Sequence, residues 1–174
     1  MPIALHATNI WKAYLAGVSG CSARVWALRG CSLVARRGER LAIVGGPAAG
    51  KTSLLHCLGG LRRVDAGAVI VEGGVRARVT VVGALRLEDC PAIALIDADH
   101  DRATTPDAGA WLERLHAIGR HRTVVIATRD AALAVSFADR IVILADGRID
   151  DPAIAPARRV AECVRAPSEV PMLR

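Results

Sequence analysis

Short apolar runs alternate along the chain with segments whose apolar residues recur at helical spacing. Runs that end at a glycine or a polar residue predict buried strands over Arg40–Val44, Ala92–Ile96 and Thr123–Ala127. A further strand is predicted over Arg140–Leu144. Helical spacing predicts helices over Lys51–Leu61, Asp107–Gly119 and Ala131–Ala138. Because strands and helices alternate, we expect an α/β fold in which helices flank a mostly parallel sheet.

The N-terminal part has a different pattern. Ile3–Asn9 and Ala27–Val34 are predicted as two strands with a loop between them, an antiparallel pair, and the polar stretch 36–39 as a turn. A further strand is expected over Ala68–Val71, whereas the composition of Arg76–Leu87 fits either a helix or a strand. We expect one domain over residues 1–150 and a Pro/Ala-rich tail over 151–174, with at most one short helix (Ala157–Arg165).

Length and composition agree with a single domain. The chain has 174 residues, of which 52% are hydrophobic and only 3% aromatic, so an Ala/Val/Leu/Ile core is expected. No apolar run approaches the roughly 20 residues needed to cross a bilayer. The first residues lack the basic start and apolar block of a signal peptide, and we therefore expect a cytoplasmic protein. The cysteines are scattered without a CxxC pair, which favours thiols without a chemical role: Cys21, Cys31, Cys57, Cys90 and Cys163.

The charge is strongly positive but evenly spread. The net charge is +6, and of the 23 basic residues only Lys12 and Lys51 are lysines. No long basic run with interleaved aromatic residues occurs, so a solvated surface is favoured and no specific nucleic-acid binding is expected. Lys51 stands where a slim ammonium suits phosphate better than a planar guanidinium would.

The sequence carries one strong motif, a P-loop of the form GxxxxGK[ST], placed between a predicted strand and a predicted helix. Its glycines let successive backbone N–H groups point at phosphate oxygens, and the helix start adds its positive dipole end. We expect Lys51 to bridge the β- and γ-phosphates and the Thr52 hydroxyl to hold Mg²⁺. The expected nucleotide-binding residues of the loop are Gly45, Gly46, Pro47, Ala48, Ala49, Gly50, Lys51, Thr52 and Ser53. The motif alone leaves ATP and GTP open.

A magnesium site needs a second oxygen ligand. The run Ile93-Ala94-Leu95-Ile96 closes on Asp97, a carboxylate at the end of a buried strand. We expect Asp97 to share the metal with Thr52, although an aspartate that only caps the next element is a common alternative.

Over Ile3 to about Asp150 the chain resembles ATP-binding cassette (ABC) proteins, most closely those of lipoprotein-release and macrolide-export type transporters. The resemblance runs through ATNIWKAYLAG, the strand pair with its P-loop, PAIALIDAD and TVVIATRDAALAVSFADRIVILADGRI. It implies that Tyr14 is the aromatic residue set against the adenine ring and that Asp97 ends the Walker B strand. It implies ATP and Mg²⁺ as cofactors.

The positions at which the chain departs from the family pattern also bear on its function. Between Val71 and Val79, where a cassette has its glutamine loop, helical subdomain and LSGGQ signature, only a few residues are present, and Gly73-Gly74 fits either a signature remnant or a strand turn. The general-base glutamate position holds Ala98 and the switch-histidine position holds Arg129. Asp99, one residue beyond Ala98, is expected to point to the other side of an extended backbone.

A methyl group at the fourth position of the loop, Ala48, is tolerable only if that residue keeps a negative φ. Together the departures indicate a degenerate cassette that binds Mg·ATP with weak or no intrinsic hydrolysis and acts as an accessory or regulatory subunit. Arg129 fits a γ-phosphate contact and an exposed loop residue equally well.

Three other functions stay open at this stage. The first is a working ATPase with Asp99 or another carboxylate as base and a full cassette as partner. The second is a small P-loop kinase, for which Arg62-Arg63 and Arg76–Arg78 offer lid arginines. The third is a relic that no longer binds nucleotide.

The resemblance also bears on partners. We expect a homodimer, or a complex with another ABC-type subunit or a membrane permease, since the flank near Val75–Leu87 is apolar and unusually exposed without a helical subdomain. Such a protein would lie peripherally at the inner face of the membrane.

Overall fold

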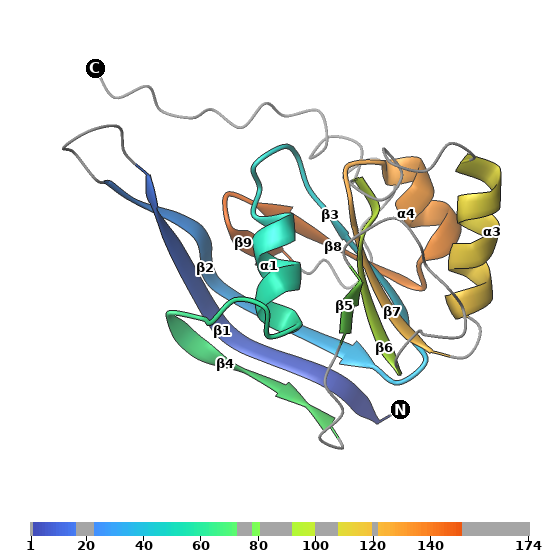
Figure 1. Ribbon diagram of the computed structural model, residues 1–174, viewed down its shortest axis with the longest axis horizontal. Coiled ribbons are helices and arrows are strands. Elements are labelled where there is room, and N and C mark those ends of the chain that lie inside the picture. The colour runs from blue at the N-terminus through green and yellow to red at the C-terminus, as the bar shows by residue number, and fades with distance from the viewer. Residues whose placement is uncertain are drawn as a thin grey trace.

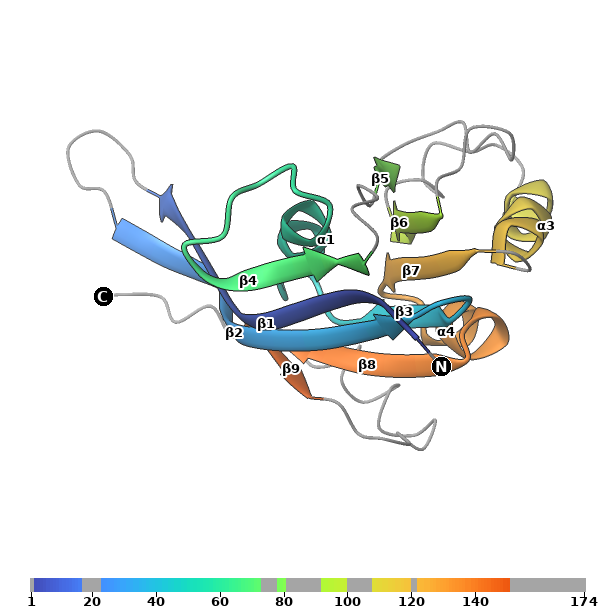
Figure 2. The ribbon, with the colours of Figure 1, turned by 90° about the horizontal axis from the view of Figure 1, so that it is seen from below.

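The chain folds around two sheets with a helix between them. The computed structural model describes residues 2–16, 23–72, 78–80, 92–99, 108–119 and 122–150. In Figure 1 the antiparallel sheet lies on one side of α1 (Lys51–Leu58) and the larger sheet on the other. The view from below in Figure 2 separates the same layers. This arrangement confirms the α/β class predicted from the sequence.

The smaller sheet is antiparallel and has the order β2-β1-β4. Its strands are β1 (Ile3–Ala16), β2 (Ala23–Arg36) and β4 (Ala66–Val71). The predicted strand pair is confirmed, but both strands are longer than the predicted Ile3–Asn9 and Ala27–Val34. Register shifts along β1 and the positive φ angles of Asn9 (50°) and Gly30 (76°) mark bulges, which break the period-2 pattern by which a strand is recognised in sequence.

The larger sheet has the order β5-β6-β7-β3-β8-β9 in the described part of the chain. All its pairings are parallel except that of β8 with β9. Its strands are β3 (Arg40–Val44), β5 (Arg78–Thr80), β6 (Ile93–Asp97), β7 (Thr123–Thr128), β8 (Arg140–Ala145) and β9 (Arg148–Asp150). The β8–β9 turn places Asp146 and Gly147 at φ angles of 48° and 72°, as in a type I′ hairpin.

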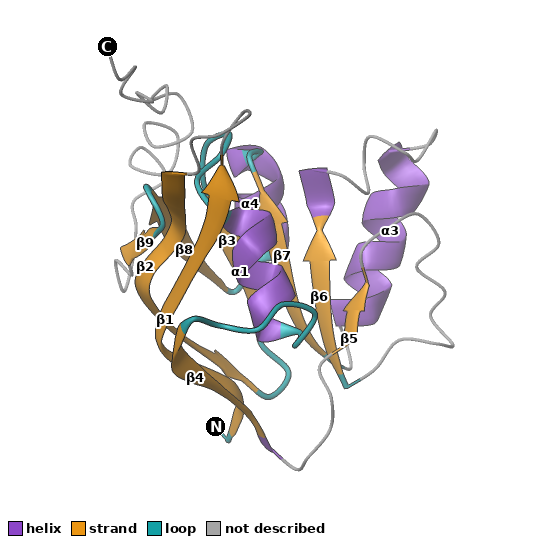
Figure 3. Cartoon of the chain, turned by 60° about the vertical axis from the view of Figure 1, so that its left-hand side comes forward, coloured by secondary structure: helices purple, strands orange, loops and turns teal. Residues whose placement is uncertain are grey.

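Two hydrophobic clusters hold the layers together. One lies between the sheets and combines Leu54, Leu55 and Leu58 of α1 with inward side chains of both sheets. The other lies on the opposite face of the parallel sheet, against α3 (Ala108–Gly119) and α4 (Ala131–Phe137). Figure 3 shows α1 between the sheets and α3 on the far side of β6.

The helices start and end where local chemistry dictates. The Asp130 carboxylate accepts hydrogen bonds from the backbone N–H groups of Ala132 and Leu133 and so caps α4. α1 ends at Leu58 rather than at the predicted Leu61, because Gly59 and Gly60 follow and Gly60 adopts a φ of 70°. The predicted helix face of α3 is confirmed, since Trp111, Leu115 and Ile118 are buried.

Several predictions fall outside the described residues. They concern the tail 151–174, most of 76–87 with the exposed flank near 75–87, and the glycines at 73–74. Within the described ranges, Cys31 and Cys57 are free and buried, and burial raises the pKa of both thiols. In those ranges no helix combines the length and the apolar character that crossing a bilayer requires.

Candidate functional site

The P-loop lies at the carboxyl ends of the parallel strands, between β3 and α1. It needs glycine at two positions for close approach: a Cβ atom on Gly45 would lie 2.3 Å from the Leu144 carbonyl oxygen, and one on Gly50 would lie 2.4 Å from that of Ala27. Ala27 belongs to β2 and Leu144 to β8, so the loop is seated between the two sheets. A larger residue at either glycine would push the loop out of this seat.

Ala48 adopts a φ of 58°, so the condition of a negative φ derived from the sequence is not met. A left-handed conformation costs an L-residue roughly 1–2 kcal/mol. The side chain is exposed and therefore adds no clash with neighbouring atoms. The loop thus keeps its shape at an energetic cost that a glycine would avoid.

Lys51 is the cation of the loop, and it is buried. Its side chain is 8% exposed, and Nζ donates hydrogen bonds to the carbonyl oxygens of Gly45 (2.7 Å) and Gly46 (2.9 Å). Asp99 Oδ2 lies 3.6 Å from the same nitrogen. Burial lowers the pKa of Lys51, and the neighbouring Asp99 carboxylate opposes that shift. The ammonium therefore contacts oxygen atoms of the protein itself.

Thr52 and Asp97, the two predicted metal ligands, lie together. The Thr52 hydroxyl donates a 2.6 Å hydrogen bond to Asp97 Oδ2. Asp97 ends β6 and is 6% exposed, while Thr52 is exposed on the first turn of α1. A hydroxyl and a carboxylate supply the hard oxygen donors that Mg²⁺ prefers, and Mg²⁺ commonly takes few protein ligands besides water and substrate phosphate. The donor set fits that ion. The described residues contain no group of three or more His, Cys, Asp or Glu side chains that could hold a metal without such help.

Asp99 corrects an expectation from the sequence. After Asp97 the backbone leaves the extended conformation and makes a helical turn at residues 98–99, so the Asp99 side chain points into the site. Its Oδ1 accepts hydrogen bonds from the Arg129 backbone N–H (2.8 Å) and the Thr128 hydroxyl (3.2 Å), and Arg129 Nε lies 3.2 Å from Oδ2. Ala98, by contrast, is 1% exposed and packs in the core cluster beside α3 and α4.

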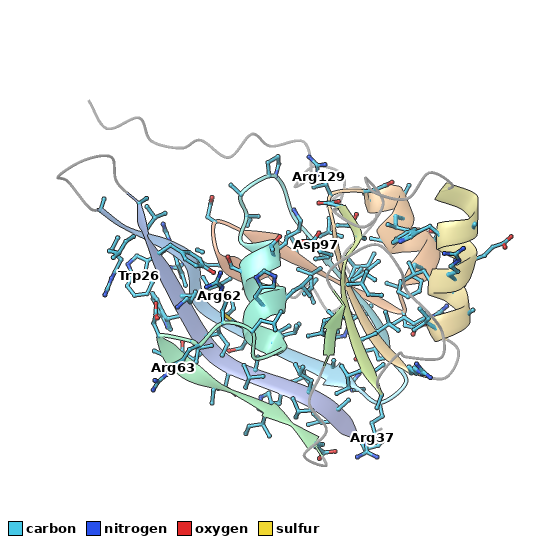
Figure 4. The ribbon with its side chains drawn as sticks, viewed as in Figure 1. Trp26, Arg37, Arg62, Arg63, Asp97 and Arg129 are labelled. Carbon is cyan, nitrogen blue, oxygen red and sulfur yellow. The ribbon has the colours of Figure 1, made fainter. Side chains whose placement is uncertain are left out.

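Arg129 and Asp97 lie at the same end of the molecule in Figure 4, close to the start of α1. Asp97 ends β6 and Arg129 directly follows β7, and these strands are neighbours because Asp97 pairs with Ala127. Thr128 was not predicted as a site residue. The signal available for it was its position directly before Arg129 in the segment ATRD.

The remaining predicted residues are Tyr14, which lies on β1, and the other residues of the P-loop. Tyr14 lies on β1 with 37% of its surface exposed, and Lys12 Nζ is 5.6 Å from its ring centroid. Pro47 is exposed, Gly46 and Ser53 are half-buried, and Ala49 is buried with its carbonyl accepting from Gly147 N–H at 3.2 Å.

Comparison with known proteins shows which fold and which sequences this chain is similar to. Residues 28–102 match the family model described as ABC transporter. The ATP-binding cassette MJ0796, in its dimeric post-hydrolysis state bound to ADP and Pi, superposes with a TM-score of 0.65 at 17% identity, over 84% of this chain and 98% of that one. The chain has the fold of an ATP-binding cassette. A second MJ0796 dimer, described as a bacterial ABC transporter cassette, gives a TM-score of 0.63 at 18% identity, covering 84% and 96% of the two chains.

In sequence, the chain is similar to the ATP-binding proteins of several transporters. The methionine import protein MetN of Rhizobium johnstonii is 51% identical over 47 residues, which are 27% of this chain and 13% of that protein. The sulfate/thiosulfate import protein CysA of Mycolicibacterium paratuberculosis is 40% identical over 83 residues (46% and 22%). The lipoprotein-releasing protein LolD of Syntrophotalea carbinolica is 40% identical over 68 residues (39% and 28%). The chain thus spans less than a third of the length of these relatives.

The family match covers only part of the site. It contains the P-loop, Asp97 and Asp99 but ends before Arg129 and begins after Tyr14. The predicted lipoprotein-release and macrolide-export subtype is narrower than the range of similar proteins, since methionine and sulfate/thiosulfate import proteins also match.

Proposed function

We propose that this chain binds Mg·ATP through its P-loop, hydrolyses it weakly or not at all, and serves as an accessory or regulatory ABC-type subunit. The observation that carries the proposal is the pairing of Thr52 with Asp97 beside a buried Lys51 at the start of α1. This places a cation, a hydroxyl and a carboxylate at the end of a phosphate-binding loop.

In the proposed complex each residue has a separate task. Lys51 leaves the Gly45 and Gly46 carbonyl oxygens and binds phosphate oxygens, while backbone N–H groups of the loop hold the same phosphate group. Thr52 and Asp97 would hold a magnesium ion, which would neutralise phosphate charge when bound. Tyr14, exposed on β1, offers its ring to the adenine.

Weak hydrolysis is supported by the residue directly after Asp97. The general-base position holds a buried methyl group, Ala98, which can take no proton from an attacking water. Losing a positioned general base typically costs about 10²- to 10⁴-fold in rate. Arg129, at the switch-histidine position, is bonded to Asp99 rather than directed freely at the nucleotide.

A working ATPase is a second candidate, and one observation favours it. Asp99 points into the site instead of away from it, so a carboxylate is present on the correct side of β6. To act as a base it would have to release at least one of its contacts with Arg129, Thr128 and Lys51. A steady-state phosphate-release assay with Asp99→Ala tests this: unchanged turnover would exclude Asp99 as the base.

Partners follow from the proposal. MJ0796 forms dimers, and the relatives are importers and a lipoprotein-releasing system by name. We propose that this chain pairs with a copy of itself, another ABC-type subunit or a membrane permease, and lies in the cytoplasm or at the inner face of the membrane. Co-purification with a tagged chain from membranes and from the soluble fraction tests both points.

The decisive experiment measures ATP binding and hydrolysis side by side on the wild type and on Lys51→Ala. We expect calorimetric binding of Mg·ATP in the micromolar range or weaker, loss of that binding in Lys51→Ala, and turnover near background in both. Arg63→Ala removes a positive charge from the exposed loop after α1 and is the matched control. A flat titration of the wild type would contradict the proposal, and turnover that vanishes with Lys51→Ala would contradict weak hydrolysis.

A further inference from the structure

Asp99 lies where the carboxyl ends of three neighbouring strands meet. It lies just beyond the end of β6, and its partners Thr128 and Arg129 lie at the end of the adjacent strand β7. β7 in turn pairs with β3, the strand that leads into the P-loop. The carboxyl ends of three neighbouring strands thus converge on one carboxylate, at the edge of a parallel sheet where ligands of such folds bind.

The Lys51 ammonium is enclosed by the loop carbonyl oxygens and by Asp99. An ammonium has three donors, and two are used by the Gly45 and Gly46 carbonyl oxygens. Asp99 Oδ2, 3.6 Å from Nζ, is the further oxygen beside this ammonium. A phosphate oxygen that reaches Nζ from the ends of β6 and β7 therefore enters the immediate surroundings of the Asp99 carboxylate.

The protein holds Asp99 in this position from several sides. Oδ1 accepts from the Arg129 backbone and from the Thr128 hydroxyl, and Oδ2 is paired with the Arg129 guanidinium. The backbone contact fixes the carboxylate even if the exposed guanidinium moves away. Asp99 is only 20% exposed, so water screens its charge incompletely.

We propose that Asp99 is a specificity-determining residue which fills the place of a terminal phosphate at Lys51 and so biases the site toward nucleoside diphosphates over triphosphates. This inference rests on the proposed nucleotide binding. A diphosphate needs Lys51 and the loop N–H groups only at its last phosphate, whereas a further phosphate group extends toward the ends of β6 and β7. There it meets the Asp99 charge, which has to be displaced together with its bonds to Thr128 and Arg129.

The size of the effect follows from like-charge repulsion. Near a protein surface, two like charges about 4 Å apart repel strongly enough to change an affinity by more than tenfold. Arg129 neutralises part of this repulsion. We therefore expect the ratio of ATP to ADP affinity to rise by at least about tenfold when the Asp99 charge is removed.

The test is calorimetric titration with Mg·ADP and Mg·ATP at about 0.15 M salt, an ionic strength at which long-range charge effects are screened but contacts are not. The wild type is compared with Asp99→Asn, which keeps the shape and one acceptor oxygen, and with Asp99→Ala, which removes the whole carboxylate. Glu113→Gln makes the same charge change on the exposed face of α3 and is the control.

We expect the wild type to bind ADP at least as tightly as ATP, both Asp99 variants to shift the ratio toward ATP, and Glu113→Gln to leave it unchanged. An unchanged ratio in folded Asp99 variants that still bind ADP would overturn the inference and leave the proposed function standing. If neither nucleotide binds to the wild type or to the variants, the proposed function fails and the inference fails with it.

Discussion

The strained conformation of Ala48 yields a prediction in which two neighbouring substitutions have opposite signs. Ala48 has a φ of 58° and an exposed side chain, so replacing it by glycine removes strain without removing packing. Relief of the left-handed conformation stabilises the fold by roughly 1–2 kcal/mol. The greater freedom of glycine in the unfolded chain takes back about 0.4–1 kcal/mol.

The expected net gain for Ala48→Gly is therefore about 0.5–1 kcal/mol in the free energy of unfolding. For a domain of this size this corresponds to an increase of about 1–4 °C in Tm. Urea unfolding followed by circular dichroism measures the free energy, and a thermal melt gives the Tm.

Ala49 provides the matched control within the same loop. It has a negative φ and is 7% exposed, so Ala49→Gly relieves no strain and removes a buried methyl group. We expect that variant to lose about 1–2 kcal/mol. If Ala48→Gly is also destabilised, the left-handed conformation of Ala48 does not describe the folded protein and the reasoning about strain in the loop is refuted.

Two further predictions concern the metal ligands and an acid-sensitive ion pair. Thr52→Val keeps the shape of the side chain but removes the hydroxyl bonded to Asp97, and we expect the tightening of ATP binding by Mg²⁺ over EDTA to fall by about tenfold or more in calorimetry; an undiminished Mg²⁺ effect would remove Thr52 from the metal site. Asp139 is bonded to Arg40, which holds the pKa of that carboxyl below its usual value, so its contribution is present above the unfolded-state pKa near 4 and is lost as the pH falls through the lower folded-state pKa. Asp139→Asn should therefore lower the free energy of unfolding at pH 7 by about 0.5–1 kcal/mol, a small value because both side chains are partly exposed. The loss should shrink steadily as the pH is lowered below about 4; a loss that stays the same as the pH falls would show that the ion pair is not the cause.

Sequence patterns predicted the parallel sheet well because its strands are buried on both faces. The runs Arg40–Val44 and Thr123–Ala127 are continuous and largely apolar, and each forms a strand in the structure. The P-loop and the proximity of Thr52 and Asp97 could also be predicted, because a motif between a defined strand and a defined helix fixes where its side chains lie.

The long hairpin and the position of Asp99 could not be predicted in the same way. β1 and β2 contain bulges that shift the alternation of side chains, so only parts of each strand had a readable period. The orientation of Asp99 depends on where β6 stops being extended, and one residue of difference reverses the direction of a side chain. Its partners Thr128 and Arg129 come from a strand about 30 residues away, as the sequence separations of 29 and 30 show, and nothing in the local sequence specifies that encounter.

The position of β3 in the sheet has a consequence for the order of folding. β3 carries the P-loop, yet its only neighbours in the described sheet are β7 and β8, which start at Thr123 and Arg140. During synthesis β3, a largely apolar strand, therefore stays unpaired until β7 and β8 have been made. Closing so long a loop is slow, and over that interval β3 is open to mispairing. The proposed nucleotide site is thus expected to form late in folding, and a ligand that binds there would act on a late folding step.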